Sequence, residues 1–143
     1  MIREPPDHEA AVDEWMGPAK RLSAAEFIDL FESGLHRMWE RAQPTLGEVT
    51  LGAIVDRVLY TATERFSFLA PLKIKEGRVE FADLRKASGS VAPGELASAA
   101  RFVVLEFLTV LGHLTAEILT PALHAELVKV RTSKARVPRK RKT

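Results

Sequence analysis

Apolar residues recur at helical spacing along most of the chain, and polar capping residues mark where helices begin. Ser23 and Glu26 have the spacing of a capping box, in which each side chain accepts from the other residue's backbone N–H. Behind this start, the apolar positions share one arc of about 120°: Ala24, Phe27, Ile28, Phe31, Leu35, Met38, Trp39 and Ala42. We therefore predict an amphipathic helix over 24–42 that ends before Pro44.

A second helical pattern covers residues 51–69, where the apolar side chains occupy one arc of about 140°. Thr45 and Glu48 repeat the capping-box spacing, and Thr50 is an alternative start. We expect this helix to end near Pro71.

The pattern then changes from helical spacing to alternation. Residues 72–81 alternate apolar and polar side chains around Glu76-Gly77, which predicts a small β-hairpin packed on the helices. A short helix follows over residues 81–87, and 88–94 has the composition of a loop.

The most apolar helix is predicted to begin near Pro93, a residue suited to the first helical position. Continued through residue 124, it gathers its polar side chains within about 40° of one line, while the apolar ones fill about 200°. This polar stripe consists of Glu95, Glu106, His113, Glu117, Thr120 and His124. A helix so widely apolar is one that other helices cover, so we predict the central helix of a bundle whose stripe meets water or a symmetric partner.

A membrane span is the alternative for this helix. It would bring two carboxylates to membrane depth, at a cost of about 2.5 to 3.5 kcal/mol each, with no excess of charge on one flank to orient the helix. We therefore expect no membrane span.

The polar stripe also raises the question of a metal site. On a continuous helix, His113 and Glu117 are i, i+4 neighbours and could ligate one ion. His36 on another helix could be a third ligand, but it lies on the polar side of the 24–42 helix. The paired Glu-x-x-His motifs of di-metal bundles do not occur. We expect no metal and no cofactor, and a solvated or interfacial stripe instead.

These elements define a mainly α protein. Its 143 residues are 46% hydrophobic, enough for one core. We predict a compact bundle of four to five helices over residues 21–130, with a small hairpin near 72–81. Residues 1–20 are expected to be a flexible arm, either poorly ordered or docked by Trp15, although the segment after Asp7 could form two helical turns.

Charged residues are distributed unevenly along the chain. Residues 1–130 hold 14 basic groups against all 19 acidic ones, whereas the last thirteen residues hold seven basic groups and no acid. We predict that this basic tail, residues 131–143, is disordered and attracts phosphate or another anion. Its cations are Arg131, Lys134, Arg136, Arg139, Lys140, Arg141 and Lys142. Because no aromatic residue interleaves them, contact with nucleic acid would be independent of base sequence.

Catalytic and targeting signals are absent from the sequence. The chain has no cysteine, phosphate-binding glycine loop, nucleophile elbow or His-Glu-x-x-His motif, and Ser88-Gly-Ser90 is explained as a loop. The first ten residues lack the apolar run of a signal peptide. We expect a cytoplasmic protein that is not an enzyme.

Three functions remain open on these grounds. The first is a regulatory or adaptor protein, a helical homodimer that binds an unknown protein partner and whose tail adds nonspecific anion affinity. The second is a nucleic-acid-associated protein acting through the tail. The third is a helical bundle that senses a ligand or a metal through His113 and Glu117.

Overall fold

The computed structural model describes residues 7–17, 22–75 and 78–129, and it confirms a mainly α fold. Within these ranges lie six α-helices and one two-stranded antiparallel sheet, one helix more than the predicted four to five. The elements are α1 (His8–Trp15), α2 (Ala24–Leu46), α3 (Glu48–Arg65), the 3₁₀ turn η2 (Ser67–Leu69), β1 (Lys73–Lys75), β2 (Arg78–Glu80), α4 (Ala82–Ala87), the 3₁₀ turn η3 (Ser88–Ser90), α5 (Pro93–Leu114) and a last helix over residues 120–129.

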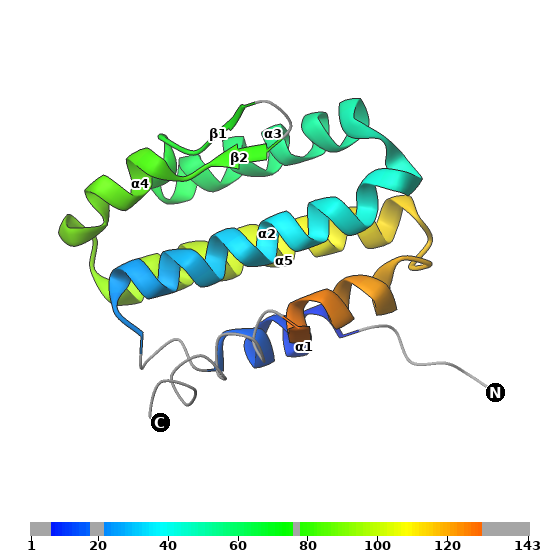
Figure 1. Cartoon of the computed structure of the whole chain (residues 1–143), viewed down its shortest axis with the longest axis horizontal. Helices are drawn as coiled ribbons and strands as arrows, with labels where there is room; N and C mark the ends of the chain where they lie inside the picture. Colours follow the sequence, from blue (N-terminus) through cyan, green and yellow to red (C-terminus); the bar gives the residue numbers. More distant parts are fainter. Residues whose placement is uncertain (1–6, 18–21, 76–77, 130–143) are drawn as a thin grey trace, which may run out of the picture.

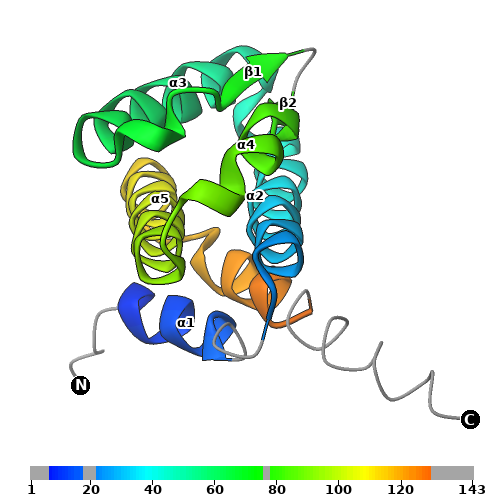
Figure 2. The ribbon, with the colours of Figure 1, turned by 90° about the vertical axis from the view of Figure 1, so that its left-hand side faces the viewer.

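The helices are arranged in three layers with α5 at the centre. Figures 1 and 2 show α2 and α5 side by side in the middle, with α3, the hairpin and α4 on one side and α1 with helix 120–129 on the other. α5 contacts α1, α2 and α3. Its buried apolar residues are Leu96, Ala99, Ala100, Val103, Val104, Phe107, Leu108 and Leu111. The predicted central helix is therefore confirmed over Pro93–Leu114.

The capping box at the start of α2 forms as predicted. The Ser23 hydroxyl accepts from the Glu26 N–H at 3.1 Å, and the Glu26 carboxylate accepts from the Ser23 N–H at 2.9 Å. The predicted end before Pro44 is wrong, because α2 continues to Leu46 with the proline inside it. A proline removes one helical hydrogen bond, and the buried Trp39 and Ala42 keep this last part of α2 on the core despite that loss.

Gly47 separates α2 from α3 and replaces the predicted capping box. Its φ of 87° lies in the left-handed region that favours glycine, and its N–H donates to the Gln43 carbonyl at 2.7 Å. Because Thr45 is still within α2, its side chain cannot cap α3, which has no side-chain cap. α3 also ends at Arg65, earlier than predicted, and η2 follows.

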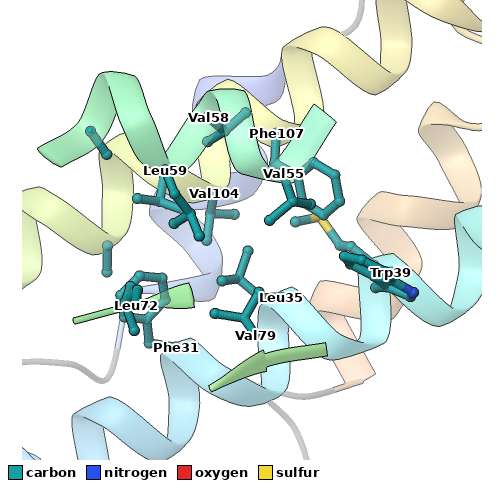
Figure 3. Close-up of a cluster of buried hydrophobic side chains, with 14 of the residues drawn as sticks. Phe31, Leu35, Trp39, Val55, Val58, Leu59, Leu72, Val79, Val104 and Phe107 are labelled. Atoms are coloured by element: carbon teal, nitrogen blue, oxygen red, sulfur yellow. The ribbon is translucent and has the colours of Figure 1, made fainter. Parts of the chain in front are cut away.

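The hairpin forms in the predicted place and covers one side of α2. Ile74 pairs with Val79, and Val79 is buried among side chains of α2, α3 and α5 (Figure 3). The ring of Phe81 meets that of Phe31 edge to face, with centroids 5.2 Å apart. His36, which the helical pattern places toward solvent, instead has its Nε2 atom 3.3 Å from the Val79 carbonyl, because the hairpin packs over that side of α2.

The part of the N-terminal segment that forms α1 packs against the rest of the fold. Asp7 caps this helix through a bond from the Ala10 N–H, and Val12 and Trp15 are buried. The Trp15 indole lies against Gly34 of α2, where a Cβ atom would be only 2.8 Å from the ring. Of the two predicted alternatives, docking by Trp15 is the one that the structure shows for residues 8–15.

Candidate functional site

The chain turns back sharply after α5. The Glu117 N–H donates to the Gly112 carbonyl at 2.7 Å and the Ala116 N–H to the His113 carbonyl at 3.3 Å, which together form a Schellman motif. Ala116 and Glu117 have φ values of 52° and 63°, in the left-handed region. The predicted continuous helix through residue 124 is therefore wrong, and helix 120–129 runs back toward α1 (Figure 1).

This turn brings together polar groups that lie far apart in the sequence. His8 Nδ1 of α1 lies 3.1 Å from His124 Nε2 of helix 120–129, and His8 Nε2 lies 3.4 Å from Glu117 Oε1. The buried Thr120 hydroxyl donates to the same carboxylate oxygen. We call His8, Glu117, Thr120 and His124 the histidine cluster.

The surroundings of the histidine cluster change the acidity of two of its groups. The Thr120 hydroxyl lowers the pKa of Glu117 by stabilising its carboxylate, and the nearby His8 adds to this effect while burial opposes it. Burial lowers the pKa of His124, and the neighbouring His8 lowers it further, against the opposing charges of Glu117 and Asp7. The structure therefore favours an ionised Glu117 and a neutral His124.

The histidine cluster joins α1 to helix 120–129 through a contact that depends on protons. The two imidazole rings meet edge to face, with centroids 5.2 Å apart. One of the two facing nitrogens must donate and the other accept, so full protonation of both rings would set two N–H groups against each other. The chemistry that this arrangement supports is a pH-sensitive contact between the two helices.

The remaining members of the predicted stripe lie elsewhere. Glu95 is exposed in the first turn of α5, Glu106 is half-buried on the same helix, and His113 is exposed in its last turn. Because α5 ends between His113 and Glu117, these residues are not i, i+4 neighbours on one helix. The proposed role of the stripe at an interface stays a prediction, but its residues do not lie along one helix.

A shared metal does not fit the groups that the structure brings together. The two ring nitrogens of His8 face different partners, one toward His124 and one toward Glu117. Within residues 7–17, 22–75 and 78–129, no group of three or more His, Asp or Glu side chains is placed to hold a metal ion.

Sequence reasoning missed His8, the residue that links the histidine cluster to α1. The capping aspartate before it predicts a helical turn, but no pattern within one sequence pairs residue 8 with residue 124. The seven tail cations, Arg131, Lys134, Arg136, Arg139, Lys140, Arg141 and Lys142, lie outside the described residues.

Two of the hollows on the surface of the described residues adjoin the long helices. One, of about 360 Å³, lies between the first turns of α2 and α5 and has a largely apolar lining that includes Leu22, Phe27 and Leu96. The other, of about 630 Å³, is an open depression between α3 and β1, lined by residues that include Tyr60 and Lys73.

The outer face of α3 carries two large hydrophobic side chains that are exposed to solvent. Val49 is 88% exposed and Tyr60 is 65% exposed, and both lie on this one helix. An exposed tyrosine beside a depression is typical of protein interfaces, where a rigid aromatic ring supplies contact area and a hydroxyl. This face is a second candidate site, for a macromolecule.

α5 is long and apolar enough, by length and composition, to cross a membrane. Half of its most apolar window is buried within the fold, and core helices of soluble proteins have the same property.

No protein-family model, curated protein or solved structure matches this chain.

Proposed function

We propose that this chain is a non-enzymatic regulatory or adaptor protein that self-associates and acts through contacts with other proteins. The observation that carries the proposal is the outward face of α3, which holds Val49 and Tyr60 in solvent. Leaving a tyrosine ring in water forgoes its burial energy, and tyrosine is enriched at protein interfaces.

The ion pairs that connect the helices also support this proposal. Arg85 of α4 pairs with Asp29 of α2 at 2.7 Å and with Glu32, and it holds α4 on the bundle. Arg101 of α5 pairs with Asp13 of α1 at 2.8 Å. These groups connect helices, as expected of a scaffold that presents a surface.

The self-association is tested by light scattering coupled to gel filtration on the full chain. We expect a mass of twice 15.9 kDa or more at the higher concentrations, falling toward the monomer mass on dilution. A strictly monomeric protein across the whole concentration range would contradict the proposal.

We propose, as a second function, that residues 131–143 bind nucleic acid through its phosphates. The supporting observation is the concentration of seven cations, without an acid, in this tail. Binding that neutralises several phosphates releases counterions, so the affinity should fall steeply with salt.

This second function is tested by titrating a labelled DNA duplex with the full chain at two salt concentrations. The matched control has the same length, with the seven tail cations replaced by glutamine. We expect the control to lose most of both the affinity and its salt dependence. DNA binding by the control that equals that of the unchanged chain would contradict a role for the tail.

A further inference from the structure

The histidine cluster can take up one extra proton without losing its contacts, but not a second. With both rings neutral, one of His8 Nδ1 and His124 Nε2 donates to the other across 3.1 Å. When His8 is protonated, its Nδ1 donates to His124 and its Nε2 faces the Glu117 carboxylate at 3.4 Å, which balances the added charge. A second proton, on His124, sets two N–H groups and two positive rings against each other. The two charged rings therefore have to separate.

The other charges around the two rings do not compensate for the second proton. Burial, followed by the charge of His8, lowers the pKa of His124, and Glu117 and Asp7 offset these effects only in part. His113 is a further titratable group near Glu117, so its positive charge competes for the same carboxylate. The second proton therefore binds below the ordinary histidine pKa of 6.5, and the contact between the rings weakens as it binds.

Exposed ion pairs also connect α1 to the fold. Arg101 of α5 lies 2.8 Å from Asp13 and 3.7 Å from Glu9, and all three side chains are partly or largely exposed. Pairs of this kind contribute little to stability and weaken further in salt. The hydrogen bond from Arg101 lowers the pKa of Asp13, so this carboxylate stays ionised in mild acid. The Arg101 pairs therefore hold α1 without making its docking depend on pH near the histidine pKa.

α1 is the more weakly held of the two helices that meet at the histidine cluster. It has eight residues, fewer than an isolated helix needs in water, so it depends on its docked contacts. Its buried side chains are Val12 and Trp15, and the indole N–H of Trp15 has no hydrogen-bond partner within the described residues. A buried donor without a partner reduces the gain from docking. Helix 120–129, in contrast, is also connected to α2, through Arg37 and Glu126 at 3.6 Å.

We propose that α1 is a cover that mild acid releases: when His8 and His124 are both charged, α1 leaves the core while α2, α3 and α5 stay folded. The inference goes beyond the proposed function and does not depend on it. α3, the hairpin and α4 lie on the other side of the α2 and α5 layer, so their contacts with this layer remain when α1 departs (Figure 2). Release uncovers the surface of α2 at Gly34, against which Trp15 lies.

The two tryptophans of the chain report the two parts of the fold separately. Trp39→Phe leaves Trp15 of α1 as the fluorophore, and Trp15→Phe leaves the buried Trp39 of α2. From about pH 7.5 to about pH 5, which is below the ordinary pKa of histidine and above that of glutamate, the emission of Trp15 should shift to longer wavelength. Its quenching by acrylamide should rise about threefold or more, whereas Trp39 should stay shielded. Circular dichroism at the higher pH verifies that both variants are folded.

Hydrogen exchange on the unchanged chain makes the same comparison without a substitution. After correction for the pH dependence of exchange itself, the amides of α1 should lose protection at the lower pH, and those of α5 should keep it. Added salt should move this loss of protection to a higher pH, because it weakens the exposed pairs of Arg101.

Single substitutions in the Trp39→Phe chain identify the trigger. His8→Gln and His124→Gln each leave one ring of the pair that can be charged, so Trp15 should stay shielded at about pH 5 in both. His36→Gln is the matched control, because it removes a histidine on the hairpin side of α2 and should leave the release unchanged.

Three results would overturn the inference. If Trp15 stays shielded at about pH 5, α1 is not released by mild acid. If Trp15 and Trp39 become exposed at the same pH, acid unfolds the whole chain and α1 is not a separate unit. If His8→Gln and His124→Gln release α1 at the same pH as His36→Gln, the histidine pair is not the trigger. All three leave the proposed self-association standing, because that is measured as a mass at neutral pH.

Discussion

Replacing Ala116 with glycine should stabilise the fold, although the same change within a helix weakens a protein. Ala116 occupies the position of the Schellman motif after α5 where the backbone is left-handed, with a φ of 52°. Glycine is the residue that this position favours, because an alanine Cβ comes too close to the following carbonyl oxygen.

The size of the effect follows from two opposing terms. An L-residue in the left-handed region costs about 1 to 2 kcal/mol, which glycine would recover. Glycine makes the unfolded chain freer, at a cost of about 0.5 to 1 kcal/mol. Because the Ala116 side chain is exposed, removing its methyl group loses little packing. The net gain should be about 0.5 to 1 kcal/mol, which raises Tm by roughly 1 to 4 °C for a chain of this length.

The assay is urea unfolding followed by circular dichroism, at one fixed protein concentration because the self-association proposed above would add to stability. Ala125→Gly is the matched control, since Ala125 is also exposed but lies inside helix 120–129. There glycine should destabilise by about 1 kcal/mol. The two variants carry the same chemical change and should shift the midpoint in opposite directions.

A fall in the free energy of unfolding for Ala116→Gly that equals the fall for Ala125→Gly would contradict this prediction. That result would mean that the turn after α5 is not left-handed at Ala116 and that the chain continues as a helix. The histidine cluster would then have no means of forming, because the turn is what carries Glu117 and His124 back to α1.

Two further predictions concern the contacts of α1. Because burial lowers the pKa of His124, the unfolded chain binds more protons below the ordinary histidine pKa of 6.5, so stability should fall as the pH drops from about 7.5 to about 5.5. Over this pH range the urea midpoint of His124→Gln should fall less than that of wild type or of His113→Gln, a control at an exposed histidine. If the midpoint of His124→Gln falls as much as the other two, His124 does not cause the pH dependence. Gly34→Ala places a Cβ 2.8 Å from the buried Trp15 ring and should cost about 1 to 3 kcal/mol in urea unfolding. Gly52→Ala lies inside α3 with open space around it and should instead stabilise by up to about 1 kcal/mol. Equal midpoints for the two alanine variants would show that Trp15 does not pack against α2.

Much of the fold could be predicted because its signals are local. The capping box at Ser23 and Glu26, the alternation that pairs Ile74 with Val79, and Pro93 at the start of α5 each act over a few residues. The wide apolar arc of α5 also predicts its central place, because only cover on several sides explains it.

The histidine cluster could not be predicted, because the turn that builds it has no local signal. Helices commonly end at glycine or before proline, but here an alanine and a glutamate adopt the left-handed backbone while the apolar pattern continues to Leu119. At Pro44 the error is the reverse, since the proline lies within a helix that tertiary packing holds together. In both places, contacts from distant residues decide where the helix ends.

The two candidate sites lie on opposite sides of the α2 and α5 layer, and this separation makes their roles distinguishable. α3 is on one side, and the histidine cluster, between α1 and helix 120–129, is on the other (Figure 2). Pairing through α3 would leave the α1 layers of both copies outward, open to a further partner. Tyr60→Ala should therefore leave the pH dependence of stability unchanged, and His124→Gln should leave the mass of the self-associated protein unchanged. If either change alters both properties, the close-packed α5, which touches α1 and α3, must shift between two arrangements and couple the sites. Measuring dimer mass and urea midpoint on both variants decides between independent and coupled sites.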